Sequence, residues 1–236
     1  MAWRDVYPVL IQLDQISVNP GTRDQICWKE GNKLLDFSSS NVWHSVRIRE
    51  QEVNWVKIVW FPQCIPKHAF LMWLILRRKL LTQDKILQWD FSRQKNMNMV
   101  CCVLCYADVD SHDHLFFECK FSTQIWNKVR HKVCMNSVDS KWSAIMNWLL
   151  DRAQSKSAAS YVSRLLVATV AYFIWQERNA RFFKNQTRPP DTICELIVKT
   201  IRYKLMGVKF KDCAKIRRML GAWILVELEI LMMGVN

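Results

Sequence analysis

Three cysteines and one histidine in the middle of the chain have the spacing of a metal site. Cys102 and Cys105 enclose two residues, His114 and Cys119 enclose four, and eight residues separate the two pairs. A Cys-x2-Cys turn lets two thiolates approach one point while backbone amides donate to the sulfurs. Zinc favours four such ligands in a tetrahedron, with Zn–S of about 2.3 Å and Zn–N of about 2.0 Å. The pattern therefore predicts one zinc ion held by these four side chains.

The predicted site is closed, which indicates a structural zinc. Three thiolates and one neutral imidazole fill the coordination sphere and leave no position for water. Two alternative ligands lie close by. Cys101 would replace Cys102 through the less common Cys-x3-Cys spacing, and His112 would replace His114 at the expense of packing by Leu115-Phe-Phe117 behind the metal. The remaining interpretation is four reduced core residues that lie near one another by chance.

Catalytic patterns do not stand out in the sequence. Tyr106-Ala-Asp-Val109 resembles the paired-aspartate hairpin of polymerases, but Val109 stands where the second aspartate would be. Polymerase chemistry needs two or more carboxylates that converge on a pair of magnesium ions. There is no glycine-rich phosphate loop, and His44, His68 and His131 are isolated. We therefore expect neither an enzyme nor a small-molecule substrate.

The chain carries a large surplus of positive charge. Its 34 lysines and arginines outnumber 21 aspartates and glutamates, which gives a formal net charge of +13. Such a surplus attracts polyanions, and charge alone leaves nucleic acid, anionic lipid and an acidic protein open. The twelve tryptophans mostly recur at helical spacing beside other apolar residues, which favours core packing over base stacking.

Basic residues are densest between residues 177 and 218, where twelve oppose four acidic residues. Five of them share helix faces by their spacing and are candidates for nucleic-acid binding: Arg178, Arg181, Lys184, Lys199 and Arg202. Such a surface positions a nucleic acid through its phosphates and does not read its sequence. The alternative is a charged helix face that is only solvated.

Cysteine usage and the N-terminus indicate an intracellular protein. The nine cysteines are odd in number, four of them fall between Cys101 and Cys119, and the N-terminus has no signal-peptide pattern. In a reducing compartment, clustered cysteines are more often metal ligands than disulfides. The longest mainly apolar run, Leu165–Trp175, has eleven residues and is interrupted only by Thr169, whereas a membrane helix needs about 20. We expect a nuclear or cytoplasmic protein that is not secreted and does not contact a membrane.

Helices must position these residues, because the chain has only five glycines and six prolines and its apolar residues recur at helical spacing. The expected fold is mainly α, with an irregular N-terminal part, helices on both sides of a zinc-knuckle-like loop, and a C-terminal helical segment. A short strand and turn is expected over 24–31. Predicted helices cover 41–49, 67–80, 142–149, 159–185, 193–206 and 214–232. Two more are expected: one that begins after the capping residue Thr82, and one that has Ile125 and Val133 on the same face.

Three regions follow from these elements. Residues 1–60 are expected to be a mixed segment that packs on the zinc domain, residues 61–152 to be the zinc-binding domain, and residues 153–236 to be a basic helical region. The small polar stretch Ser155–Ser160 is the best candidate boundary between the last two.

The order of several motifs resembles a known family. In chain order they are Asp24, Trp28 and Gly31, then Phe37-Ser38, Trp55-Val-Lys-Ile-Val-Trp60, Ile65-Pro-Lys-His-Ala-Phe70, Leu80-Leu-Thr-Gln-Asp84, the metal-ligand pattern from Cys102 to Cys119, and Tyr172-Phe-Ile-Trp175 with the residues up to Phe182. This set, which spans about residues 24–185, resembles the zinc-binding domain C-terminal to the reverse transcriptase of plant LINE-type (non-LTR) retroelements. The ordered set is specific, although each motif by itself is weak.

The resemblance implies a zinc module that helps a polymerase hold RNA or DNA, with its ligands at Cys102, Cys105, His114 and Cys119. Asp110 stands where the family usually has glutamate. No polymerase core precedes residue 24 and no RNase H pattern follows residue 185, so we expect a fragment or remnant. The resulting hypothesis is non-specific nucleic-acid binding, with the reverse transcriptase polypeptide as a further partner. The alternatives are a zinc-stabilised protein-interaction module and a non-functional remnant.

Overall fold

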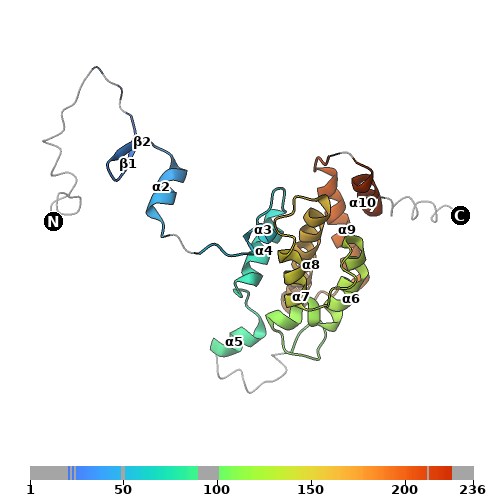
Figure 1. Ribbon diagram of the computed structural model, residues 1–236. Helices are drawn as coiled ribbons and strands as arrows, with labels where there is room; N and C mark the ends of the chain where they lie inside the picture. The colour runs from blue at the N-terminus through green and yellow to red at the C-terminus, as the bar shows by residue number, and fades with distance from the viewer. Residues whose placement is uncertain are drawn as a thin grey trace. The chain divides into compact units, whose positions relative to one another are not determined.

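The computed structural model describes residues 21, 23, 25–48, 51–89, 101–211 and 213–224. The chain divides into two compact units, residues 1–51 and residues 52–236, which are described separately (Figure 1). All four predicted metal ligands lie in the second unit. As the sequence predicts, the described residues are mainly helical.

The first unit contains a β-hairpin and a short helix. Strands β1 (Cys27–Glu30) and β2 (Lys33–Asp36) pair antiparallel, with Cys27 opposite Asp36. Gly31 in the turn has φ +60°, a conformation that glycine adopts without steric penalty. The strand predicted over 24–31 is present as β1, although residue 24 lies outside the described residues. Strand β2 was not predicted, because Lys-Leu-Leu-Asp shows no alternation of apolar and polar residues.

Helix α2 (Ser39–Val46) follows the hairpin and buries none of its residues within the described structure. Its position agrees with the helix predicted over 41–49. An isolated two-stranded hairpin is marginally stable in water, and α2 adds no buried apolar surface to it. The second unit therefore contains the apolar core of the described chain.

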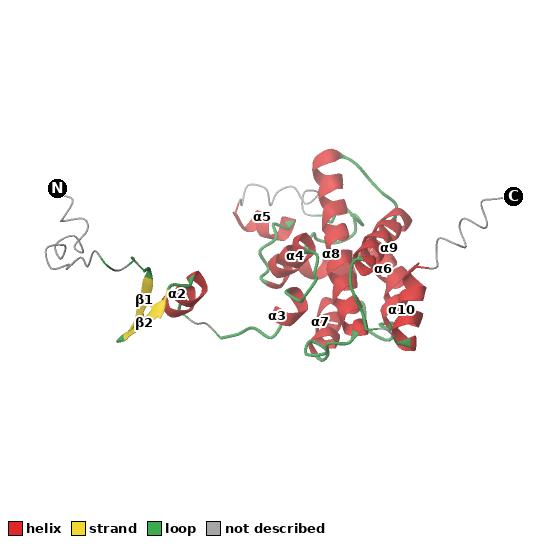
Figure 2. Ribbon diagram, turned by 90° about the horizontal axis from the view of Figure 1, so that it is seen from above, coloured by secondary structure: helices red, strands yellow, loops and turns green. Residues whose placement is uncertain are grey.

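The second unit is built around one long helix, α8 (Ala158–Lys184). Helices on several sides contact it, and both ribbon views show it between α4 and the pair α6 and α9 (Figure 1 and Figure 2). The other described elements of this unit are α3 (Val56–Val59), α4 (Pro66–Leu76), α5 (Gln83–Trp89), η4 (His114–Glu118), α6 (Lys120–Val129), η5 (Arg130–Val133), α7 (Trp142–Leu150), α9 (Pro190–Met206) and α10 (Ala214–Ile224).

Helix α8 is apolar because it is the core helix. Every residue from 162 to 171 is buried. By length and composition α8 would also suit a membrane, with a mean hydropathy of 1.4 over its most apolar 18-residue window, but 72% of that window is buried inside the protein. Interior packing thus accounts for its composition. The eleven-residue apolar run seen in the sequence is the centre of this helix.

Local signals set the ends of α8 and α9. Ser157 Oγ accepts a hydrogen bond from the backbone N–H of Ser160 (3.2 Å), as an N-cap does. Asn185 ends α8 in the left-handed conformation with φ 51°. Pro190 begins α9 at a position where its missing N–H is not needed. The helices predicted over 159–185 and 193–206 are thereby confirmed to within three residues.

Two predicted helices end differently. Helix α4 begins one residue earlier than predicted and ends at Leu76 rather than residue 80, because Arg78 adopts φ +50° and cannot continue a right-handed helix. The helix predicted over 214–232 is present as α10 up to Ile224, and residues 225–232 lie outside the described structure.

The regions 61–152 and 153–236, distinguished by sequence, belong to one compact unit together with residues 52–60. The polar stretch between α7 and α8 is anchored to its surroundings, since Ser160 Oγ donates to the carbonyl of Arg152 (2.9 Å). The packing of the N-terminal segment on the zinc domain stays a prediction.

Candidate metal centre

The first two predicted ligands lie on a tight knuckle. The backbone N–H of Cys102 donates to the carbonyl of Asp108 (2.7 Å), and the N–H of Tyr106 donates to the carbonyl of Cys102 (2.8 Å). Cys101 and Val109 form an antiparallel bridge at the base of this loop. Tyr106 reverses the chain with φ +56°, a conformation that is strained for a residue other than glycine. The loop thereby turns the side chains of Cys102 and Cys105 toward one point.

The other two ligands lie at the ends of a single π-helical turn, η4. The backbone N–H of Cys119 donates to the carbonyl of His114 (2.6 Å), which is the i→i+5 bond of a π-helix. This turn places residues five apart next to each other. His114 and Cys119 are five apart, so the turn brings both side chains to the same side, where they can face one ion. Ser122 Oγ donates to the carbonyl of Leu115 and Thr123 Oγ1 to that of Phe117, each at 2.6 Å. Side chains of α6 thus satisfy carbonyls within the turn.

The apolar residues between these ligands anchor the turn. Leu115, Phe116 and Phe117 are fully buried. The ring of Phe117 lies 5.2 Å from that of Trp126 and 5.6 Å from that of Trp142, measured between centroids. The predicted packing of Leu115-Phe-Phe117 behind the metal site is therefore present, and it holds His114 and Cys119 against the core.

The four ligand atoms have the spacing of a tetrahedral zinc site. They all lie within 4.8 Å of one another, with Cys102 Sγ 3.9 Å from Cys119 Sγ and Cys105 Sγ 3.3 Å from His114 Nε2. Zn–S bonds of about 2.3 Å and Zn–N bonds of about 2.0 Å correspond to tetrahedral edges of about 3.8 Å between sulfurs and about 3.5 Å between sulfur and nitrogen. The four side chains therefore form a site for one structural zinc ion.

The surroundings of Cys119 favour the thiolate, which is the form that binds zinc. The pKa of Cys119 is lowered to about 5, first by a hydrogen bond from Cys102 and further by the backbone N–H groups of Ser122 and Phe121 at the start of α6. The pKa of Cys102 is raised by sharing that proton with Cys119 and by burial. Backbone N–H groups of Leu104 and Cys105 oppose that rise, as expected of a knuckle that binds a metal.

Neither alternative ligand belongs to the cluster. Cys101 lies at the bridge with Val109, and His112 is buried with its Nδ1 3.2 Å from Thr82 Oγ1. Burial, followed by the charge of Lys85, lowers the pKa of His112 to about 4 and keeps its ring neutral. The four ligands closest in space are those chosen from spacing.

One charged neighbour of the metal site was not anticipated from the sequence. Asp108 Oδ2 lies 3.7 Å from His114 Nδ1, the ring nitrogen opposite the one that faces Cys105. This separation is longer than a hydrogen bond, so the contact is electrostatic. A carboxylate at this position favours the orientation of a metal-binding imidazole. Asp108 is the aspartate of the Tyr106-Ala-Asp-Val109 segment that resembles a polymerase hairpin, and in the structure it faces a zinc ligand.

A buried ion pair and hydrogen bonds to backbone carbonyls join the zinc loop to α8. Asp110 Oδ2 accepts hydrogen bonds from Arg178 Nη2 (2.6 Å) and Nε (3.2 Å), and also from the backbone N–H of Gln83 (3.1 Å). Arg181 donates to the carbonyls of Val103 (3.4 Å) and Leu104 (3.3 Å) on the knuckle. These contacts connect the metal loop with a helix far along the chain, since Asp110 and Arg178 are 68 residues apart in sequence.

A second buried carboxylate organises the end of α8. Glu177 is fully buried and lies 2.8 Å from both Arg181 Nε and Arg188 Nε. Burial raises the pKa of Glu177, but hydrogen bonds from Arg181 and from the backbone and side chain of Arg188 outweigh it, so the pKa lies below its usual value. Glu177 is therefore ionised and offsets part of the positive charge of Arg181 and Arg188.

The five candidate nucleic-acid-binding residues divide into buried and exposed groups. Arg178 is buried against Asp110, the side chain of Arg181 is 11% exposed, and Arg202 is buried with its Nε donating to the carbonyl of Trp223 (2.9 Å). Lys184 and Lys199 are exposed. Helical spacing correctly places Arg178, Arg181 and Lys184 near one face, but it does not reveal that the zinc loop covers part of that face.

The fold and the site together define a mainly helical protein with a closed Cys3His site for structural zinc. Residues 37–126, which contain all four ligands, match the model of the family described as zinc-binding in reverse transcriptase. The match covers well under half of the chain and ends within α6. No curated protein and no solved structure matches the chain.

Proposed function

We propose that this chain is a zinc-stabilised module that binds the phosphate backbone of RNA or DNA without sequence preference. The zinc ion has a structural role, and the chain performs no catalysis of its own. The family match supports a link to reverse transcription, and a protein in that setting encounters both RNA and DNA.

The distribution of charge is the observation that carries the proposal. In the described interior, Arg178 is paired with Asp110, and Arg181 and Arg188 are paired with Glu177. These three arginines and two carboxylates sum to a charge of only +1, so most of the net charge of +13 is carried by exposed lysines and arginines. A cationic surface of this kind binds polyanions by releasing their counterions.

Lys184 and Lys199 are the strongest contact candidates among the five residues chosen from sequence. Both are exposed, and no ion pair within the described ranges involves either of them. Lys128 and Lys141 are also exposed, but each faces a carboxylate, Asp191 and Asp139 respectively. The first pair of lysines therefore has no competing carboxylate among the described residues, although Lys199 Nζ lies 5.9 Å from the ring centroid of Tyr203. The second pair serves as a matched control.

A salt titration of binding tests the proposal. Fluorescence anisotropy with labelled single-stranded and double-stranded oligonucleotides would give the affinity between low and moderate salt. Each phosphate contact contributes a slope of about 0.7–0.9 in log affinity against log salt, so replacing Lys184 and Lys199 by alanine should reduce the slope by about 1.4–1.8. Replacing Lys128 and Lys141 should change it less. An affinity that does not vary with salt would exclude backbone binding.

We further propose that the module derives from a plant LINE-type retroelement, where it lies C-terminal to the polymerase and assists it in holding nucleic acid inside the nucleus or cytoplasm. The sequence motifs from Trp55 to Phe182 support this origin. Co-purification with a reverse transcriptase polypeptide of that type would support the partnership, and failure of the two polypeptides to bind each other would argue against it.

A protein-interaction module is the second candidate function. Exposed large apolar side chains favour it, including Phe70 on α4 and Tyr203 and Met206 on α9, which are 53%, 62% and 69% exposed. Sedimentation of the zinc-loaded chain distinguishes the candidates. Self-association without nucleic-acid binding would favour the interaction module, and a monomer that binds oligonucleotides would favour the first proposal.

A further inference from the structure

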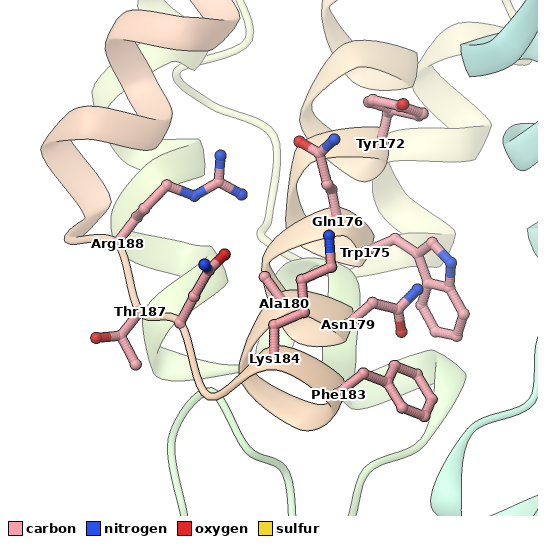
Figure 3. A pocket seen from close by; sticks show the side chains of 10 residues that line it. Tyr172, Trp175, Gln176, Asn179, Ala180, Phe183, Lys184, Thr187 and Arg188 are labelled. Atoms are coloured by element: carbon pink, nitrogen blue, oxygen red, sulfur yellow. The ribbon is translucent and has the colours of Figure 1, made fainter.

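The C-terminal half of α8 borders a pocket of about 660 Å³ whose lining contains none of the four zinc ligands (Figure 3). Sites for small ligands commonly have volumes of about 300–1,000 Å³. Three aromatic side chains of α8 line the pocket, Tyr172, Trp175 and Phe183, and the segment 186–188 after the helix lines it as well. The pocket lies entirely within the second unit.

Part of the aromatic lining of this pocket is exposed to solvent. Trp175 is partly buried, with the guanidinium carbon of Arg178 5.0 Å from its ring centroid. Phe183 is 71% exposed, and its ring meets that of Phe182 edge-on with 4.9 Å between the centroids. The phenyl ring of Phe183, about two helical turns along α8 from Trp175, leaves apolar ring surface in contact with water. Such a surface gains free energy when a flat aromatic ligand covers it.

Unpaired polar groups lie beside these rings. Figure 3 shows Gln176 and Asn179 projecting from α8 near Trp175, and Lys184 extending back along the helix toward Gln176. Among the described residues, no hydrogen bond or ion pair engages the side chains of Gln176 and Lys184. Asn179 uses its Oδ1 to accept from Arg178 Nη1 (3.0 Å), which leaves its amide NH₂ available.

The charge of the pocket favours an anionic ligand. None of its lining residues is acidic, and the neighbouring carboxylate of Glu177 is already committed to Arg181 and Arg188. Lys67 lies at the other end of the aromatic row, with its Nζ 5.0 Å from the ring centroid of Tyr172. Two exposed lysines therefore lie near the aromatic lining, Lys67 at Tyr172 and Lys184 along the side of α8 that carries Gln176.

We propose that this pocket binds an unpaired base of a single-stranded nucleic acid, stacked on Phe183, with Lys184 contacting an adjacent phosphate. The proposal rests on the backbone binding proposed above and adds recognition of the base. Aromatic rings accept any base as a stacking partner, and side-chain amides such as those of Gln176 and Asn179 can bond to exposed base edges. A paired base cannot enter, because it is stacked inside its duplex.

The test compares the affinities of three ligands for the zinc-loaded full chain. They are a labelled single-stranded oligothymidylate, an abasic backbone of the same length, and a duplex, each measured by fluorescence anisotropy. Stacking on an aromatic side chain changes affinity by about five- to 150-fold per base, and we expect about a tenfold preference for the strand that carries bases. Phe183→Ala should remove this preference and leave the abasic affinity and the salt dependence unchanged.

Tyr203→Ala is the matched control, because Tyr203 is also an exposed ring, at 62%, but lies on α9 and does not line the pocket. It should leave the preference for bases intact. Equal binding of the abasic and base-containing strands by the unmodified chain would overturn the base site while leaving backbone binding in place. Equal losses of preference in the two variants would also overturn it. Failure of every ligand to bind would overturn the proposed function itself.

Discussion

The buried pair between Asp110 and Arg178 should contribute more to stability than any exposed ion pair of this protein. The side chains of Arg178 and Asp110 are 3% and 1% exposed, and Asp110 Oδ2 accepts three hydrogen bonds, two from Arg178 and one from the backbone of Gln83. Asp110→Ala would leave a guanidinium and an N–H group buried without their acceptor. We expect the free energy of unfolding to fall by about 3–5 kcal/mol.

This loss can be measured by thermal and denaturant unfolding of the zinc-loaded chain. For a unit of this size, a change of 1 kcal/mol shifts the melting temperature by about 2–4 °C, so Asp110→Ala should lower it by about 6–20 °C. Asp113→Ala is the control on the same loop. Asp113 also binds an arginine through two hydrogen bonds, but the side chains of Arg78 and Asp113 are 61% and 57% exposed. Its loss should cost about 0–1 kcal/mol.

A second variant separates the pair from general damage to the loop. Asp110→Leu combined with Arg178→Met removes both buried charges, and apolar replacement of a buried pair is often neutral or stabilising. The double variant should therefore regain most of the stability lost in Asp110→Ala. Equal effects of Asp110→Ala and Asp113→Ala, or no recovery in the double variant, would refute the reasoning that burial makes this pair important.

Three further predictions follow from the metal site and the core. The unmodified chain should carry one zinc ion, and Cys102→Ser should lower both its zinc content and its melting temperature. Cys101→Ser should change neither quantity. Metal analysis measures the zinc content, and calorimetry measures the melting temperature. Tyr106→Gly should stabilise the protein by up to about 1 kcal/mol, since glycine adopts φ +56° without strain; a loss of stability would show that the ring contributes more than the strain. Burial, followed by the charge of Lys67, lowers the pKa of His68 from 6.5 to about 4. The folded state thus resists its protonation, and roughly 3 kcal/mol of stability present above pH 6.5 should be lost as the pH falls toward 4. His68→Gln should lack this part of the pH dependence, and identical pH profiles would contradict the assignment.

Much of the site could be predicted from local sequence because metal ligands must satisfy a short-range geometry. The Cys-x2-Cys knuckle and the His-x4-Cys turn are each closed by backbone hydrogen bonds within a few residues, such as that from Cys119 to His114. Helix ends at Ser157, Asn185 and Pro190 were predictable for the same reason, since caps depend on neighbouring residues. The π-helical form of the second turn was not predicted, because it depends on packing by α6.

The sequence by itself thus determined the four zinc ligands, the order of the helices and the excess of positive charge, all of which depend on residue type and short spacing. Only the tertiary structure decided which charges are available. Arg178 and Arg181 are basic by sequence, yet Asp110, Glu177 and the carbonyls of the zinc loop engage them. These partners come from segments far apart in the chain, and contacts at such separation depend on how α8 packs rather than on any local pattern. The same packing leaves Phe183 and Lys184 exposed at the end of that helix.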